Sequence, residues 1–208
     1  MLDYYIIDNF IDEKYVDKIL EGIKQSSYVC LDGKKEKHLI GETHYEYNVH
    51  RDSIRDNKEL RTHVFEKLNN FYLKELNKTC NSENLNPLNF FTKSFNSYQS
   101  FYDLHTEDSK YFGDIVFMLY LNDEADGELV LPNYNDSKAL WTKGFESMMQ
   151  KLDVKFVKNT VKITPKRNRC VFVKVGIAHY VKPCSGKRYT LTGWSFASDE
   201  YYKKFYNK

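Results

Sequence analysis

The second half of the chain is a series of short strand-like runs, which restricts the possible folds more than any other feature of the sequence. From Leu88 onward, runs rich in β-branched and aromatic residues are separated by Asn, Gly, Pro and Asp, which favour turns. The runs are Phe90–Phe95, Gln99–His105, Ile115–Leu121, Glu128–Leu131, Val161–Ile163, Cys170–Val175, Ala178–Val181 and Arg188–Phe196. About eight short strands joined by turns predict a sandwich, a barrel or a jelly roll.

The first third of the chain predicts one short strand and two amphipathic helices. The strand is the apolar run from Tyr4 to Asp8, which ends at an Asp-Asn turn signal, and Asp12 is a suitable N-cap for the first helix. Apolar residues recur at helical spacing at Tyr15, Val16, Ile19, Leu20 and Ile23, and again at Leu60, Val64, Leu68, Phe71 and Leu76. The polar stretch between the helices, about 33–56, predicts loop and irregular strand.

The length of 208 residues fits one domain around one hydrophobic core. We interpret residues 1–208 as a single domain, mainly β with supporting helices, in which residues 1–88 support a β core at 89–196. The connection at 133–159 is long for a β protein and contains a helix-like piece around Leu140–Leu152. Because long connections with their own structure are often lids or binding elements, we expect this insertion to cover the entrance of a binding site.

Charge and cysteine content exclude several classes of protein. The formal net charge is +2 with both signs interspersed, so the sequence carries no nucleic-acid-binding signature. The first residues lack a basic region followed by a long apolar run, and no run of about eighteen apolar residues occurs, so we expect neither a signal peptide nor a membrane span. The four cysteines form no CxxC pair, which argues against a disulfide framework or a cysteine zinc site. We expect a cytoplasmic protein with reduced, buried thiols, and its oligomeric state is open.

Three positions in the β half hold side chains suited to binding a metal ion. His105 and Glu107 are two residues apart in YDLHTEDSKYF, so on a strand they project to one face and offer a nitrogen and an oxygen ligand. His179, in GIAHYVKP, offers a second imidazole. Two histidines and a carboxylate form the facial triad of non-haem Fe(II) oxygenases. Asp103 has the same parity as His105 and is an alternative ligand, whereas Asp108 qualifies only if the strand ends at Glu107.

A fourth feature is the alternation of the run RYTLTGW near the end of the β half. On a strand, Arg188, Thr190, Thr192 and Trp194 share one face. A guanidinium binds a carboxylate with two hydrogen bonds, and hydroxyls supply further ones, so this face suits a carboxylate ligand. The alternative is an edge strand with a solvated polar face and Leu191 turned toward the core.

In this order the motifs resemble the prolyl 4-hydroxylase branch of the Fe(II)- and 2-oxoglutarate-dependent dioxygenase superfamily. The HxE motif at His105 is followed by MLYLND, DGELVLP, KITPKRNRCVFV and AHYVKPCSGKRYTLTGWSF. His179 precedes Arg188 by the interval typical of this family. The resemblance covers about residues 95–196 and implies a double-stranded β-helix, or jelly roll, packed against the N-terminal helices.

The same resemblance implies the cofactors and the residues that hold them. The cofactor is Fe(II) and the cosubstrates are 2-oxoglutarate and O2, with ascorbate as an additional reductant. His105, Glu107 and His179 match the iron ligands, and Arg188 matches the residue that binds the distal carboxylate of 2-oxoglutarate. The remaining residues expected in the cosubstrate pocket are Tyr120, Thr190, Thr192 and Trp194.

Three positions test this resemblance. The family usually has aspartate where this chain has Glu107, whose longer side chain changes the reach to the metal. Asn168 stands where glycine is common and predicts a left-handed turn. Locally, the turn between His179 and Arg188 looks like a hairpin, whereas the resemblance implies that it carries the chain from one sheet to the facing one.

The resemblance favours a prolyl residue in a peptide or protein as the substrate to be hydroxylated. A free amino acid, a small metabolite and a nucleobase are alternatives, since one fold serves many substrates. A non-catalytic jelly-roll binding module would need neither an intact triad nor Arg188. A zinc hydrolase is a further alternative, but the helical HExxH spacing is absent.

Overall fold

A computed structural model shows how these elements are arranged. The residues that it describes are 2–25, 29–30, 45–48, 58–79, 91–95, 102–123, 126–184 and 188–195. Most of the polar stretch 33–56 lies outside them, as do Phe90, Phe196 and residues 99–101 of the predicted strands.

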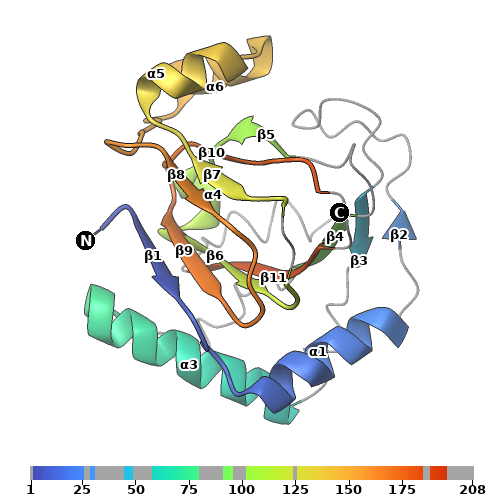
Figure 1. Cartoon of the computed structure of the whole chain (residues 1–208). Helices are drawn as coiled ribbons and strands as arrows, with labels where there is room; N and C mark the ends of the chain where they lie inside the picture. The colour runs from blue at the N-terminus through green and yellow to red at the C-terminus, as the bar shows by residue number, and fades with distance from the viewer. Residues whose placement is uncertain are drawn as a thin grey trace, which may run out of the picture.

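The described strands form two facing antiparallel sheets, the architecture of a double-stranded β-helix (Figure 1). The larger sheet has the order β1 (Tyr4–Ile7), β9 (Cys170–Lys174), β6 (Ile115–Tyr120), β11 (Arg188–Ser195), β4 (Phe91–Phe95), β3 (Tyr45–Asn48) and β2 (Val29–Cys30). The smaller sheet has the order β5 (Tyr102–His105), β10 (His179–Val181), β7 (Leu129–Leu131) and β8 (Val161–Ile163). The predicted jelly-roll fold is confirmed, and the strands observed differ from the predicted runs mainly at their ends.

Two helices, α1 (Glu13–Gln25) and α3 (Lys58–Leu76), cover the outer face of the larger sheet (Figure 1). The strands of this sheet alternate, so that one set of side chains meets the helices and the other set faces the smaller sheet. On β6, Phe117 and Leu119 belong to the core shared with α1 and α3, whereas Val116 and Tyr120 belong to the core between the sheets. At β6 both faces of the larger sheet are therefore buried, and the inner one faces the smaller sheet.

The connection between β10 and β11 carries the chain from the smaller sheet to the larger one. β10 pairs with β5 and β7, whereas β11 pairs with β4 and β6. The local interpretation of this turn as a hairpin is therefore wrong, and the crossing implied by the family resemblance is confirmed. This crossing places His179 and Arg188 on opposite walls of the space between the sheets.

The insertion at 133–159 contains α5 (Tyr134–Ser137), a short 3-10 helix η1 (Lys138–Leu140) and α6 (Lys143–Lys151), the last of which confirms the helix predicted around Leu140–Leu152. Phe145 of α6 is buried in a core with Leu104 and Ala178, whose strand neighbours His105 and His179 face the other way. The helices thus cover the outer face of the smaller sheet (Figure 1). They lie behind the two histidines and not over the space between the sheets.

Asn168 ties the β core to the start of α1. Its φ of 60° confirms the predicted left-handed turn. Its side chain accepts a hydrogen bond from the Ile11 backbone N–H at 3.0 Å and donates to the Ile11 carbonyl at 2.7 Å. Beside it, Asp8 receives a two-pronged contact from Arg169, with N–O distances of 2.7 Å and 3.2 Å. The N-terminal segment is therefore fixed to the turn before β9 by polar contacts as well as by the β1–β9 pairing.

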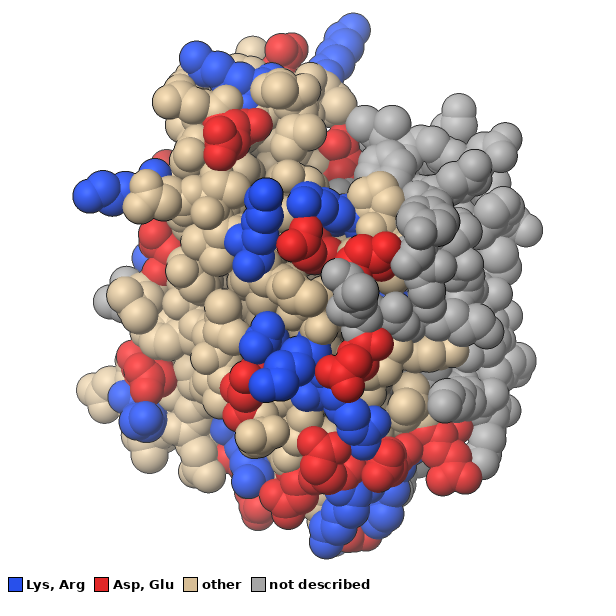
Figure 2. Space-filling view, viewed as in Figure 1, with Lys and Arg blue, Asp and Glu red and all other residues tan. Residues whose placement is uncertain are grey.

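The surface and the cysteines agree with an ordinary globular chain. Figure 2 shows acidic and basic side chains interspersed over the face in view. Within the described residues, no helix combines the length and the apolar character that a bilayer crossing requires. The Cys170 and Cys184 side chains are buried, and burial raises the pKa of the Cys170 thiol, which keeps it protonated and inert. Cys80 lies outside the described residues, and of Cys30 only the backbone is described.

Candidate active site

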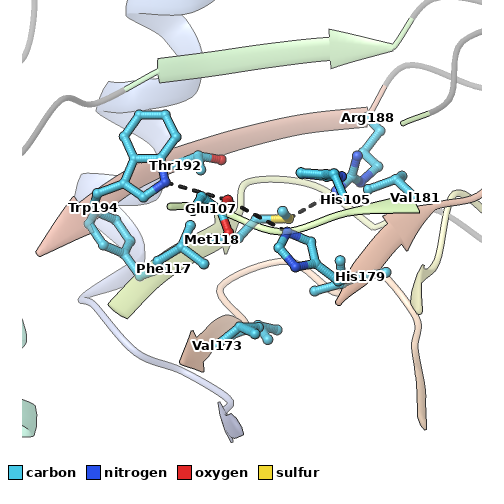
Figure 3. A pocket seen from close by; sticks show the side chains of 13 residues that line it. His105, Glu107, Phe117, Met118, Val173, His179, Val181, Arg188, Thr192 and Trp194 are labelled. Atoms are coloured by element: carbon cyan, nitrogen blue, oxygen red, sulfur yellow. Dashed lines mark hydrogen bonds and ion pairs between the residues drawn. The ribbon is translucent and has the colours of Figure 1, made fainter. Parts of the chain in front are cut away.

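The pocket between the sheets is built on the inner face of β11. Thr190, Thr192 and Trp194 are paired with Tyr120, Met118 and Val116 of β6, and directly opposite residues of an antiparallel pair project to the same side. Arg188 lies two residues before Thr190 and joins the same face, as the alternation predicted. A cavity of about 30 Å³ lies between this face and β5 and β10 (Figure 3). The polar face of β11 is therefore enclosed, and the edge-strand alternative is wrong.

One wall of the pocket brings together the three predicted metal ligands. His105 and His179 face each other across the β5–β10 pair, with ring centroids 4.4 Å apart. Glu107 lies two residues beyond the end of β5, and its Oε1 is 3.6 Å from His179 Nε2. One donor atom from each of the three residues lies within 4.8 Å of the others. His179 and Glu107 are buried, so the group is shielded from bulk water.

Both histidine rings are oriented by main-chain carbonyl groups. His105 Nδ1 lies 2.7 Å from the Asp103 carbonyl oxygen, and His179 Nδ1 lies 2.9 Å from the Ile177 carbonyl oxygen. Because a carbonyl oxygen can only accept, each Nδ1 must carry the proton and donate it. The lone pair of the neutral ring then resides on Nε2, which suits metal binding. The two imidazoles are therefore held in the tautomer that a metal site needs.

The Glu107 carboxylate completes a donor set that fits Fe(II). Trp194 Nε1 donates to Glu107 Oε1 at 3.5 Å, a long hydrogen bond. Glu107 Oε2 is buried and has no hydrogen-bond partner among the described residues. A buried carboxylate oxygen without a partner is costly, and coordination to a cation would satisfy it. Two imidazole nitrogens and one carboxylate oxygen are the ligands that non-haem iron takes in a facial triad.

The two alternative carboxylates have other roles. Asp103 Oδ1 accepts a hydrogen bond from the Leu104 backbone N–H at 2.8 Å. Asp108 Oδ1 accepts one from the Lys110 N–H at 2.9 Å and caps α4 (Ser109–Phe112). Neither belongs to the group formed by the histidines and Glu107. The geometry therefore favours Glu107 over both alternatives.

The opposite end of the pocket carries Arg188 and a set of hydroxyl groups. Arg188 is 1% exposed, and its guanidinium lies over the Tyr120 ring, 5.1 Å from the ring centroid. The Thr190 and Thr192 hydroxyls are buried with no hydrogen-bond partner among the described residues, and the Tyr120 hydroxyl has no well-aligned one. Burial raises the pKa of Tyr120, and the positive charge of Arg188 opposes this only in part, so the phenol stays protonated and can donate. A buried cation beside such hydroxyls suits the carboxylate of a ligand.

Two residues that sequence analysis did not single out shape this end of the pocket. Gly127 has a φ of 74°, and a Cβ at this position would lie 2.9 Å from Cys184 Cβ and 3.2 Å from Arg188 Cδ. The glycine thus leaves room for the arginine stem, and its only signal was the Asp-Gly turn. Met118 lines the pocket beside Arg188 and shares the parity of Tyr120, which was the available signal.

A second depression, of about 290 Å³, opens beside Glu107. It is lined by charged side chains, among them Lys174 and Asp153, and by the turn at Gly176. Leu152, Asp153 and Lys155 at the end of the insertion contribute to its wall, whereas Trp141 and Phe145 line neither depression. The expectation that the insertion covers a binding-site entrance is thus wrong for its helices. Among its described residues, those that border the second depression follow α6.

Comparison with known proteins identifies the family. The family model for the 2OG-Fe(II) oxygenase superfamily matches residues 93–196, which include all three proposed metal ligands and Arg188. This chain belongs to the 2OG-Fe(II) oxygenase superfamily. It is accordingly a 2-oxoglutarate-dependent non-haem iron dioxygenase, with Fe(II) as cofactor and 2-oxoglutarate and O2 as cosubstrates. No curated protein sequence matches it.

Solved structures of other 2OG oxygenases share its fold. A prolyl hydroxylase from Trichoplax adhaerens, in complex with a hypoxia inducible factor oxygen degradation domain peptide fragment, gives a TM-score of 0.59 at 14% identity, over 96% of this chain and 86% of that one. The viral collagen prolyl hydroxylase of Paramecium Bursaria Chlorella virus-1, in a 2OG complex, gives 0.54 at 14% identity, over 93% and 95%. HygX from Streptomyces hygroscopicus, with nickel and 2-oxoglutarate bound, gives 0.58 at 9% identity, over 91% and 81%.

Proposed function

We propose that this oxygenase hydroxylates a prolyl residue in a peptide or protein, with iron held by His105, Glu107 and His179 and with the distal carboxylate of 2-oxoglutarate held by Arg188. The observation that carries this proposal is that one pocket has a group of metal ligands at one end and a buried arginine at the other. Three converging donor atoms lie on the wall formed by the smaller sheet, and a buried guanidinium lies on the wall formed by the larger one. A dicarboxylate that bridges facing sheets, which lie about 10 Å apart, meets both.

Different residues of the site would bind the metal and the cosubstrate. The histidines and Glu107 would hold the metal, which when bound would supply the activation of oxygen. Arg188 and the protonated Tyr120 neutralise and orient the distal carboxylate, and the hydroxyls of Thr190 and Thr192 offer further hydrogen bonds. Burial of this end of the pocket excludes water and strengthens each of these contacts.

The peptidyl-proline assignment has two kinds of support. The motifs of the chain follow those of prolyl 4-hydroxylases, and two of the solved structures that share its fold are prolyl hydroxylases. The depression beside Glu107 is the place we propose for the residue to be hydroxylated, since it borders one of the three proposed metal ligands. A free amino acid, a small metabolite and a nucleobase are alternatives, because the same fold serves unrelated substrates.

The proposal is tested by following succinate and carbon dioxide release from 2-oxoglutarate in the presence of Fe(II) and O2. Without any further substrate, we expect slow succinate release from the wild type and none from His179→Ala. A library of proline-containing peptides should stimulate this release, and the peptide that is hydroxylated should gain the mass of one oxygen. A non-catalytic module or a hydrolase would release no succinate. Stimulation by free amino acids or nucleosides, with no response to peptides, would replace prolyl hydroxylation by the corresponding alternative.

A further inference from the structure

The side chain of Met118 occupies the position in front of the buried arginine. Arg188 Nη2 donates to Met118 Sδ at 3.0 Å, and Figure 3 shows the thioether directed toward the guanidinium. Every other residue of β6 is buried, whereas Met118 is partly exposed and lines the pocket. Its exposed surface therefore faces the cavity that we assign to 2-oxoglutarate.

The contact joins a strong donor to a weak acceptor. A thioether sulfur accepts hydrogen bonds poorly, whereas a carboxylate accepts two from a guanidinium in a planar fork. A carboxylate that reaches Arg188 therefore makes a stronger interaction than the sulfur does. The exchange is accessible because methionine is unbranched and has three rotatable side-chain bonds.

The narrow cavity in front of Arg188 favours such an exchange. With Met118 in this position the cavity measures about 30 Å³, which is room for roughly two water molecules. To lie in front of Arg188, a carboxylate must therefore take the place that the Met118 sulfur now occupies. Tyr120, Thr190 and Thr192 are buried and fixed in the sheet, whereas Met118 is the flexible side chain among the inward-facing residues of β6.

We propose that Met118 acts as a displaceable latch on the cosubstrate pocket, holding the Arg188 guanidinium until the distal carboxylate of 2-oxoglutarate takes its place. This inference rests on the proposed function of Arg188. The latch raises the concentration of 2-oxoglutarate that the enzyme needs, because each binding event must first break the N–H···S contact. Met118 thus sets the cosubstrate requirement without touching the metal.

The latch has a thermodynamic signature that ordinary packing lacks. If 2-oxoglutarate displaces the sulfur, the N–H···S contact stabilises only the free protein. Met118→Leu keeps the volume but removes the acceptor, so it should lower the melting temperature of the free protein more than that of the complex. By linkage, the same variant should bind 2-oxoglutarate more tightly, by roughly 3- to 10-fold, the range expected for one hydrogen bond.

The experiment uses the full chain loaded with Zn(II), which is redox-inert and diamagnetic. Binding of 2-oxoglutarate is measured by calorimetry for wild type, Met118→Leu and Met118→Val, with Met149→Leu as the matched control in the insertion core. In parallel, 13C-methyl-methionine spectra are recorded with and without 2-oxoglutarate. We expect tighter binding in both Met118 variants, unchanged binding in the control, and a large shift of the Met118 methyl signal with little change at Met149.

The outcomes separate the latch from the function on which it rests. If wild type binds 2-oxoglutarate and Arg188→Lys weakens that binding, the cosubstrate site stands, and Met118 can be judged independently. Affinities in both Met118 variants equal to or weaker than that of wild type, or an unmoved Met118 signal at saturation, would overturn the latch alone. Binding that is indifferent to Arg188 would overturn the proposed cosubstrate site, and the latch with it.

Discussion

Glu107 is one methylene longer than the aspartate usual in this family, and Glu107→Asp is therefore a sharp test of the site. The substitution draws the carboxylate back by roughly 1.5 Å. Metal–oxygen distances tolerate deviations of only about 0.2 Å. To restore the bond, the backbone would have to follow the shortened side chain.

The structure opposes that backbone movement. Glu107 lies between the end of β5 at His105 and Asp108, whose side chain caps α4. His105 is fixed in turn by its pairing with His179. We therefore expect Glu107→Asp to weaken Fe(II) binding by at least about tenfold, the lower end of the losses seen when support of a metal ligand is disturbed. The variant that restores the family's usual motif should thus bind metal less well.

The measurement is an anaerobic Fe(II) titration in the presence of 2-oxoglutarate, followed by the weak visible charge-transfer absorption of the complex. Asp103→Ala is the matched control, because the Asp103 carboxylate contacts the Leu104 N–H and should not affect metal binding. Iron affinity within threefold of wild type in Glu107→Asp would contradict the reasoning about reach. Full binding in Glu107→Ala together with loss in Asp103→Ala would move the ligand to position 103.

Three further changes test other parts of the structure. Arg188→Met should raise the dissociation constant of 2-oxoglutarate more than tenfold, since losing a buried charge pair costs about 2–5 kcal/mol. Calorimetry should find the metal affinity unchanged, and an affinity for 2-oxoglutarate equal to that of the wild type would refute the prediction. Asp8→Asn should cost about 0.5–1 kcal/mol in urea unfolding at pH 6, after allowance for solvent screening. Hydrogen bonds from Arg169, and then from Lys166, lower the pKa of Asp8, so its contribution is fully present above the unfolded value near 3.9 and shrinks progressively as pH falls toward the lowered folded pKa. A difference between wild type and Asp8→Asn that does not shrink between pH 6 and pH 2 would contradict this assignment. Phe145→Ala should destabilise the protein by about 3–5 kcal/mol in the same assay, because Phe145 is 1% exposed in the core behind the smaller sheet. The affinity for 2-oxoglutarate should stay unchanged, and weaker cosubstrate binding in a folded variant would indicate a direct role for the insertion.

The sequence contained enough to predict the strands and the polar face of the site, because both depend on a two-residue period. Alternation alone placed Arg188, Thr190, Thr192 and Trp194 on one face; the register with β6 confirms it for the last three, and Arg188 lines the same pocket. Family resemblance was needed for the step from β10 to β11. Local turn chemistry is compatible with a hairpin, and only the pairing partners distinguish the two arrangements.

What the sequence could not supply are contacts between distant segments. The hydrogen bonds of Asn168 with Ile11 join residues 157 positions apart, and no local pattern encodes them. The sequence also did not show which side of the β core the insertion covers, since an amphipathic helix such as α6 packs equally well over a pocket or behind a sheet. The role of Met118 depends on where the end of the Arg188 side chain lies, which is a property of the packed site. The division of the chain at residues 88 and 89 within a single domain stays a prediction.

The main-chain carbonyl groups that orient His105 and His179 have a consequence for how this site can change over evolutionary time. Each carbonyl belongs to the residue two positions earlier, Asp103 or Ile177. Every amino acid carries a backbone carbonyl, so neutral drift at positions 103 and 177 leaves the tautomer of both rings untouched. Sites that orient a histidine through a neighbouring carboxylate must retain that carboxylate, whereas here the orientation is inherited with the strand conformation itself. Substitutions that alter the path of β5 or β10 are therefore the ones that would uncouple the rings from the metal.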